Sequence, residues 1–405
     1  MESDKPQRLK EWRASHQISQ KGDVCLHTRP ALHDFARGIT NDEQYGPLVR
    51  TLELDFFLDG WPERSISRAP RTVKSDTSPQ HQSQSQAQQA RSGQDEIEGA
   101  EATLSPSLAR TALTALHTAT INCGHSTARP TLMPPSLAVQ IAALGAAPSL
   151  TRLVLLRTRF ASTAEAARVL WAFPRVRTIE LTWVRVAPAD ALDACAEVEN
   201  LQEAYPDRLK GLRELRITEP GSVDAILSVF ADAPALLYLY IAPGHDRESI
   251  EDAEDVGFQQ LRKLPALRHL HLELTAPEYD AFWAAALVRD YLRARAPRDL
   301  LTLEFSGDHA APHVLRDAAN WGPAFDDALA RQTHPPRVVE LLYRIVDLLD
   351  DAPRRAQVMR EIAEGFPKLA AHDRCELVVD PVFEPWGSTA GKRSGKLPGP
   401  VAHGN

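Results

Sequence analysis

The sequence predicts a mixed α/β solenoid, in which a parallel sheet forms the concave face and helices cover the convex face. Three observations lead to this prediction. The spacing apolar-x-x-apolar-x-apolar recurs along the chain, segments with helical periodicity separate its copies, and one copy with its helix is too small to fold alone. Stacking of successive copies buries the surfaces that a single copy leaves exposed.

The recurring apolar triplets predict short strands. The last two apolar positions of each copy are two residues apart, so they lie on the same face of an extended chain, and their neighbours face the other way. An earlier copy begins at Val49, and Leu377 with Val379 is expected to end the series. The six central copies begin at Leu150, Val176, Leu212, Leu236, Leu267 and Leu300.

The segments that follow several of these strands predict helices. Residues 162–165 have the Ser-x-x-Glu form of a capping box, which predicts a helix that begins there and ends before Pro174. Ser222 precedes a second helix, and Pro277 precedes a third. Two apolar stripes near the C-terminus predict capping helices: Val338, Leu341, Leu342, Ile345 and Leu349 form the first, and Val358, Met359, Ile362 and Phe366 form the second.

A single repeat unit cannot be stable by itself. Its three inward aliphatic side chains contribute about 5 to 9 kcal/mol on burial, which is far less than the entropy cost of ordering about 30 residues. Neighbouring units must therefore stack on it.

Composition divides the chain into four parts. Residues 1–64 form a short N-terminal segment with a first repeat-like strand, and residues 103–380 form the solenoid with its C-terminal capping helices. Between them, residues 65–102 are expected to be a disordered linker, because 12 of the 20 residues in 75–94 are Gln or Ser. Residues 381–405 are expected to be a disordered tail.

Segments 148–155, 174–181 and 265–272 resemble leucine-rich repeats, and with the helix predicted after residue 162 they are similar to the irregular repeats of fungal F-box/leucine-rich-repeat-like proteins. The resemblance covers about residues 46–377 without the linker. It implies an irregular leucine-rich-repeat-like solenoid and the role of a substrate-recognition subunit of a cullin-type ubiquitin ligase. We expect irregular turns, because the family's Asn or Cys after each strand is replaced by Thr158, Val184, Pro220, Gly244, Thr275 and Asp308.

Proteins of that family commonly begin with an F-box, a helical motif that binds the Skp-type adaptor of the ligase. No Leu-Pro-x-Glu start with apolar helices precedes Val49, and only residues 30–39 offer a short apolar stripe. The Skp-type adaptor is therefore an expected partner only if an F-box equivalent exists. Two explanations are open: a truncated gene, or a relative that has no F-box.

Charge and hydropathy exclude several classes of partner. The chain carries 46 Lys and Arg against 54 Asp and Glu, a net charge of −8, which argues against a nucleic-acid partner. It has neither a run of 18 apolar residues nor an N-terminal signal, so we expect no membrane association and an intracellular protein, cytoplasmic or nuclear. The four cysteines are widely spaced, which is typical of reduced thiols.

No motif predicts catalysis, a cofactor or a metal ion. The segment 387–393 has three residues between its glycines where a phosphate loop has four. His309 and His313 have the spacing of a helical zinc site, but Pro312 interrupts the turn between them. Cys123 and His125 supply two ligands where a structural zinc site needs four.

The outward residues of the strands are the candidate binding surface. Arg216, Tyr238 and Tyr240 are the expected anchors, because Arg and aromatic side chains bury large areas at low entropic cost. The alternative interpretation is a merely solvated strand face on which the tyrosines cover one another. The predicted partner-binding residues of the concave face are Arg152, Glu180, Arg216, Tyr238, Tyr240, His269, His271 and Glu273.

The expected function is thus a non-catalytic scaffold for protein–protein recognition. Two alternatives are open: an F-box-less or degenerate repeat protein with a different binding role, and an enzyme that uses a pocket on the solenoid. The second alternative requires a pocket in which two or more titratable side chains converge.

Overall fold

A computed structural model of the chain describes residues 19, 21–42, 44–55, 103–124, 130–187, 200–220, 222–231, 233–242, 259–274, 284, 287–292, 299–309, 311–330, 335–345 and 352–381. The predicted linker 65–102 and all but the first residue of the predicted tail 381–405 lie outside these residues. So does most of the helix predicted after Pro277, of which residues 284 and 287–292 are described and helical. The chain forms two compact units, residues 1–212 and residues 213–405.

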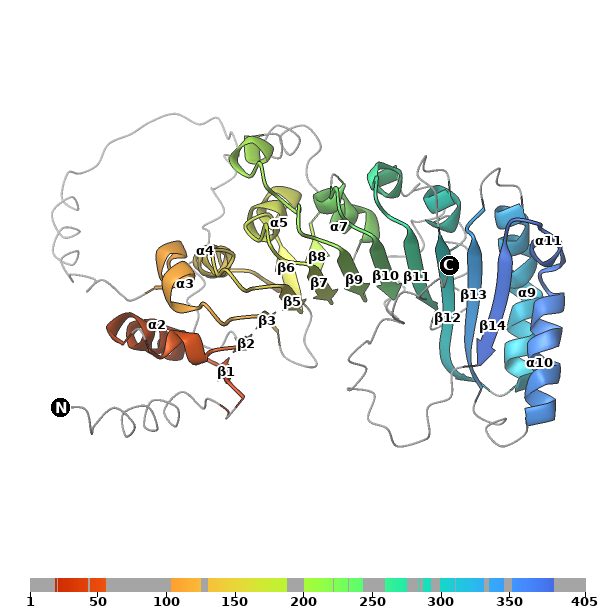
Figure 1. Cartoon of the computed structure of the whole chain (residues 1–405), viewed down its shortest axis with the longest axis horizontal. Helices are drawn as coiled ribbons and strands as arrows, with labels where there is room; N and C mark the ends of the chain where they lie inside the picture. Colours follow the sequence, from red (N-terminus) through yellow and green to blue (C-terminus); the bar gives the residue numbers. More distant parts are fainter. Residues whose placement is uncertain are drawn as a thin grey trace, which may run out of the picture. The chain divides into compact units, whose positions relative to one another are not determined.

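The described residues of the first unit form five parallel strands in the order β1-β2-β3-β5-β7 and a small second sheet in the order β4-β6-β8 (Figure 1). The strands of the larger sheet are β1 (Asp23–Leu26), β2 (Thr51–Asp55), β3 (Thr118–Asn122), β5 (Arg152–Leu156) and β7 (Thr178–Thr182). The small sheet consists of β4 (Thr131–Leu132), β6 (Thr158–Phe160) and β8 (Arg185–Val186). The helices are α2 (Arg29–Asn41), η1 (Gly46–Leu48), α3 (Pro106–Ala112), α4 (Pro135–Leu144) and α5 (Thr163–Leu170).

The second unit contains six strands that pair in sequence order, each parallel to the next. They are β9 (Glu214–Thr218), β10 (Tyr238–Ala242), β11 (His269–Leu274), β12 (Leu300–His309), β13 (Val338–Ile345) and β14 (Glu376–Pro381). The helices are α7 (Val223–Phe230), η4 (Gln259–Lys263), α9 (Ala311–Ala330), α10 (Ala352–Glu364) and α11 (Pro367–Ala370). Helix α9 contacts β13, while α10 and α11 contact β14 (Figure 1).

The apolar triplets form strands because their last two positions face the core. Both positions are buried in every predicted copy before the C-terminal pair, for example Leu153 with Leu155 and Leu270 with Leu272. The residues between them are only partly buried, as two-residue alternation predicts, except Glu304, which is buried. The predicted α/β class with parallel strands is confirmed for each unit.

The helix predicted from Val338 to Leu349 is wrong, because residues Val338–Ile345 form strand β13. The apolar residues of this segment satisfy helical and extended spacing at once. Val339, Leu341 and Tyr343 alternate and are buried, and pairing with both β12 and β14 selects the extended form. The second predicted stripe is a helix, α10, in which Val358 and Ile362 are buried.

Strands β1 and β3 were not predicted from the sequence. Their buried pairs, Val24 with Leu26 and Ala119 with Ile121, have the same two-residue separation as the recognised copies. The copy in β3 was not recognised because Ala119 is a small residue at an apolar position. The copy in β1 was not recognised because a Lys occupies the first apolar position of its triplet.

Three of the described turns after strands are more uniform than predicted. Arg157, Trp183 and Glu219 each lie two residues after the last buried residue of a strand, and all three adopt a left-handed backbone with φ of 51°, 57° and 50°. At the position where the family carries Asn or Cys, the Thr158 hydroxyl donates a hydrogen bond to the carbonyl of Leu156 at 3.0 Å. Backbone geometry thus repeats here without a ladder of Asn side chains.

The predicted helix starts at Ser162 and Ser222 are confirmed. The Ser162 hydroxyl accepts from the amide of Glu165 at 3.1 Å, and the Ser222 hydroxyl accepts from the amide of Ala225 at 3.3 Å. The Glu165 carboxylate accepts from the backbone amide of Ala161. A standard capping box would use the amide of Ser162, one residue later.

Gly145 is required by the close approach of two successive repeats. A Cβ atom at this position would overlap the carbonyl oxygen of Ala172. We therefore expect Gly145→Ala to lower the free energy of unfolding by about 1 to 3 kcal/mol, as for other overpacked sites, measured by chemical denaturation. At Gly322 the nearest atom to an added Cβ is 3.3 Å away, so the control Gly322→Ala should cost less. Equal losses in the two variants would contradict this prediction.

Candidate binding site on the sheet of the second unit

Polar and aromatic side chains gather on the outward face of strands β9 to β13. We call this set the polar wall. Six predicted binding residues belong to it, and Glu214, Thr302, Glu304 and Glu340 join them in four groups of hydrogen bonds that cation–π and ring contacts connect. The predicted residues of the wall are Arg216, Tyr238, Tyr240, His269, His271 and Glu273.

The hydrogen bonds of the polar wall slant in one direction across the strands. Tyr238 lies opposite His269 in the register, but its hydroxyl bonds to Nδ1 of His271, two residues further on, at 3.0 Å. The Tyr240 hydroxyl donates in the same way to the Glu273 carboxylate. Such diagonal neighbours are within reach of long side chains on a twisted sheet.

The slant continues from β11 to β12. His269 Nε2 lies 3.0 Å from the Thr302 hydroxyl, and His271 Nε2 lies 3.1 Å from the Glu304 carboxylate. Each of these contacts again joins a residue to the position two further on in the next strand. The next hydrogen bond has no slant. The Thr302 hydroxyl donates at 3.0 Å to the carboxylate of Glu340, the residue directly opposite it on β13.

These partners fix where the protons lie. The Thr302 hydroxyl donates its single hydrogen to Glu340, so it can only accept in its contact with His269. Nε2 of His269 therefore carries the proton of that ring. The Glu304 carboxylate can only accept, so His271 donates to it from Nε2, while Nδ1 of the same ring shares a hydrogen bond with the Tyr238 hydroxyl. Tyr238, His271 and Glu304 therefore form a chain of two hydrogen bonds.

Burial keeps three side chains of the polar wall in their neutral forms. It raises the pKa values of Tyr238 and Tyr240, so both phenols are protonated donors. It also lowers the pKa of His269 to about 3, and the neighbouring His271 adds to this effect.

The guanidinium group of Arg216 lies over the rings of both Tyr238 and Tyr240. Its guanidinium carbon lies 5.8 Å from the ring centre of Tyr238 and 5.7 Å from that of Tyr240, and its Nε lies 2.6 Å from the Glu214 carboxylate. The ring of Tyr238 meets that of His269 edge to face at 4.6 Å. Arg216 thus contacts both of the other predicted anchors.

Two predicted binding residues lie in the first unit and not on the polar wall. Arg152 on β5 and Glu180 on β7 form an ion pair at 2.8 Å. Glu180 is two positions beyond the residue that faces Arg152, so this contact shows the same slant. Half of the Arg152 side chain is exposed, so the pair contributes little to stability.

Glu340 was missed because its segment was predicted to be a helix. The first unit also contains a small polar cluster that the sequence did not reveal. Asp55 accepts from the Asn122 amide at 2.9 Å and lies 3.4 Å from Nδ1 of His27, and the Cys25 sulfur is 4.0 Å from that same nitrogen. Burial and the nearby Glu53 and Asp55 raise the pKa of Cys25 to about 11, so the thiol is not an activated nucleophile.

Among the described residues, no three His, Cys, Asp or Glu side chains are placed to share a metal ion. Cys123 is buried, and its pKa is raised to about 11 by that burial, while His125 lies outside the described residues. The segment 387–393 also lies outside them. Within the described part of the chain, every helix is too short or too polar to cross a lipid bilayer.

The neutral state of His269 predicts a dependence of stability on pH. Its pKa is about 3 in the folded chain and 6.5 in the unfolded chain, so between these values only the unfolded chain takes up the proton. Stability is therefore lost as pH falls from about 6.5. From pH 7 to pH 5 the wild type should lose up to about 2 kcal/mol more free energy of unfolding than His269→Gln, measured by urea denaturation. Equal losses would show that His269 is protonated in the folded chain.

Comparison with known proteins adds no relative. Neither a family model nor a curated protein matches this sequence. The polar wall must therefore be interpreted from its own geometry.

Proposed function

We propose that this chain is a non-catalytic scaffold for protein–protein recognition and that its polar wall binds the partner. One observation carries the proposal: hydrogen bonds, cation–π contacts and ring contacts together join the side chains selected by strand alternation and hold their rotamers. A surface ordered in this way loses little side-chain entropy on binding. Arg216, Tyr238 and Tyr240 supply the residue types that dominate binding energy at interfaces.

The charge of the polar wall favours a basic partner segment. Four carboxylates, on Glu214, Glu273, Glu304 and Glu340, stand against the single guanidinium of Arg216. A segment with Lys or Arg beside an apolar residue would complement this field and meet the tyrosine rings. Its affinity should fall as the ionic strength rises.

We also propose that the repeats form an irregular leucine-rich-repeat-like solenoid with the polar wall on its concave face. The repeated parallel register in each unit supports this, as do the helical segments between strands. On the resemblance, the bound partner would be a substrate for cullin-type ubiquitin ligation.

Adaptor binding through residues 30–39 is disfavoured. This stripe lies on α2, and its apolar residues Leu32, Phe35 and Ile39 are buried in the core of the first unit. Side chains committed to the core are not available to dock on a Skp-type adaptor.

The test is affinity capture with the tagged full chain and with a variant in which Tyr238 and Tyr240 are both replaced by Ala. Proteins retained by the wild type and lost by the variant are identified by mass spectrometry. Exposed Arg177, in the first unit, provides a control as Arg177→Ala. A partner set that is the same for all three baits would refute binding at the polar wall. Purified Skp-type adaptor, added separately, tests the ligase role.

An enzyme is the second candidate, and one observation favours it. The chain from Tyr238 through His271 to Glu304 has the connectivity of a proton relay. Against it, burial raises the pKa of Tyr238, which opposes release of the phenolic proton. The recognition role therefore accounts for more of the geometry.

A further inference from the structure

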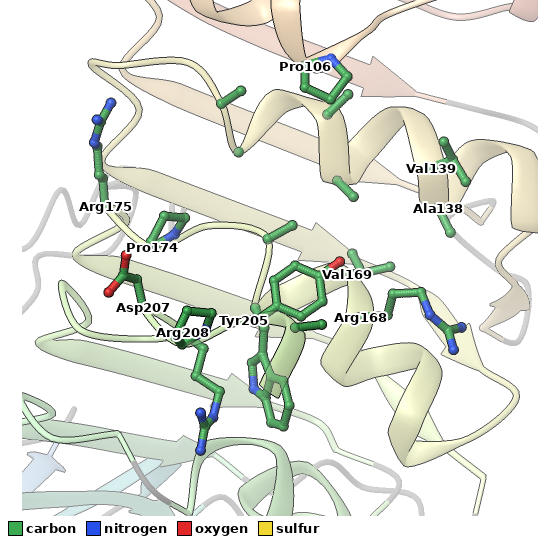
Figure 2. A pocket seen from close by; sticks show the side chains of 18 of the residues that line it. Pro106, Ala138, Val139, Arg168, Val169, Pro174, Arg175, Tyr205, Asp207 and Arg208 are labelled. Carbon is green, nitrogen blue, oxygen red and sulfur yellow. The ribbon is translucent and has the colours of Figure 1, made fainter. Parts of the chain in front are cut away.

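The first unit contains a groove that is separate from the polar wall. It has a volume of about 1090 Å³ and lies over α3, α4, α5 and the turn at residues 204–208. This volume is slightly above the range of about 300 to 1,000 Å³ that small-molecule pockets occupy. The groove is therefore large enough for a segment of polypeptide. Figure 2 shows Tyr205 in its middle, with side chains from several elements around it.

The groove is lined mainly by apolar and small side chains. Val139 on α4 lines the groove and is 68% exposed, which makes it the most exposed large aliphatic residue in the described part of the chain. Pro106 and Pro135, at the starts of α3 and α4, and the ring of Tyr205 extend the apolar lining. Exposed apolar surface of this kind is typical of interaction sites.

Three arginines border the apolar lining. Arg110, Arg168 and Arg175 are exposed, and none of them forms an ion pair with another described residue. Arg168 and Arg175 lie on opposite sides of Tyr205 (Figure 2). The groove thus carries positive charge at separate points on a chain whose net charge is −8.

The acidic residues of the groove do not neutralise these arginines. The Glu165 carboxylate accepts from the amide of Ala161 at 2.6 Å, as part of the cap of α5. The Asp207 carboxylate pairs with Lys210. A further cation, Arg208, lies over the ring of Trp171 at 5.1 Å.

We propose that this groove docks an acidic amphipathic segment of a partner protein. The apolar side chains of the segment fill the space beside Val139 and Tyr205, while its Asp or Glu residues pair with Arg110, Arg168 and Arg175. Guanidinium groups bind carboxylates in a planar geometry that a rigid rim can preset. The apolar lining sets the choice of partner, because a nucleic acid or an anionic headgroup alone would leave it exposed to water.

The probe is a random 14-residue peptide library displayed on phage and selected on the full-length chain. We expect the enriched peptides to combine Leu, Ile or Phe with Asp or Glu. One enriched peptide is then labelled with fluorescein, and its affinity is measured by anisotropy. Val139→Asp should weaken it at least about tenfold, since it buries a carboxylate against the apolar residues of the peptide.

Charge reversal tests the arginines separately. Arg168→Glu and Arg175→Glu should each weaken the same peptide by about threefold to tenfold. The matched control is Arg177→Glu, which makes the same charge change at an exposed residue two positions from Arg175 and outside the groove. It should leave the affinity within about twofold, the effect of long-range charge at physiological salt.

Several outcomes would overturn the proposal. They are a selection that enriches no peptide, enriched peptides that are basic, and acidic peptides whose affinity is unchanged by Val139→Asp. Displacement of the labelled peptide by DNA or by phosphatidylserine vesicles, with no loss in the Val139→Asp variant, would assign the site to those ligands instead. Because the polar wall is intact in all these variants, failure here leaves the proposed function untouched.

Discussion

Replacement of Tyr238 and Tyr240 by Ala should abolish binding of the partner of the polar wall. Each ring is held between Arg216 and a histidine, so its removal deletes contact area and also releases the guanidinium. Truncation of an anchor typically costs 2 kcal/mol or more, so each single variant should bind about thirtyfold more weakly. The dissociation constant is measured by titration calorimetry with the partner identified by capture, and Arg216→Ala should behave in the same way.

Tyr238→Phe and Tyr240→Phe separate the rings from their hydroxyls. The rings and their contacts with Arg216 are kept, but the hydrogen bonds to His271 and Glu273 are lost. We expect a loss of about 1 kcal/mol, or about fivefold in affinity, for each Phe variant. Circular dichroism should show unchanged helix content in all these variants, since none of the replaced residues lies in a helix. A partner that tolerates loss of both rings would place the interface elsewhere.

Arg262→Ala should cause the largest loss of stability among single surface substitutions in the second unit. Arg262 on η4 pairs at 2.5 Å with Asp290, whose side chain is completely buried. Loss of the cation removes an ion-pair partner of a fully buried carboxylate, which should lower the free energy of unfolding by about 2 to 4 kcal/mol, measured by urea denaturation.

Arg268→Ala is the matched control for this prediction. Arg268 pairs with Asp299 at 3.2 Å, but the two side chains are 54% and 53% exposed. Water replaces the partner of an exposed carboxylate, so this variant should lose less than about 1 kcal/mol. A similar loss for the two variants would mean that burial of Asp290 does not govern the strength of its pair.

The sequence predicted the strand faces well because their signal is local. Two-residue alternation depends only on the strand itself, and it correctly placed Tyr238, His271 and the other outward residues of the second unit on one face. The hydrogen bonds among them depend on register and twist between strands. No periodicity within one strand contains that information.

The incorrect and missing predictions have the same physical cause: contacts between segments, and not the local sequence, decide these features. In residues 338–345 the apolar side chains are dense enough to fit two periods, so the choice between helix and strand was made by the neighbours β12 and β14. Glu340 entered the site only as a consequence of that pairing. The groove of the first unit was missed because its residues come from four segments that meet only in the folded chain.

The slanted hydrogen bonds of the sheet have a consequence for folding fidelity. Apolar alternation rejects a strand that slips by one residue, because that slip would send leucines into water. It does not reject a slip by two, which keeps every leucine inside. A slip by two changes the polar pairs instead, because His269 or Glu273 would take the place of His271 beside the Tyr238 hydroxyl, and Tyr240 would no longer lie diagonally opposite Glu273. Registers that bury the same leucines therefore differ in the polar pairs that they form.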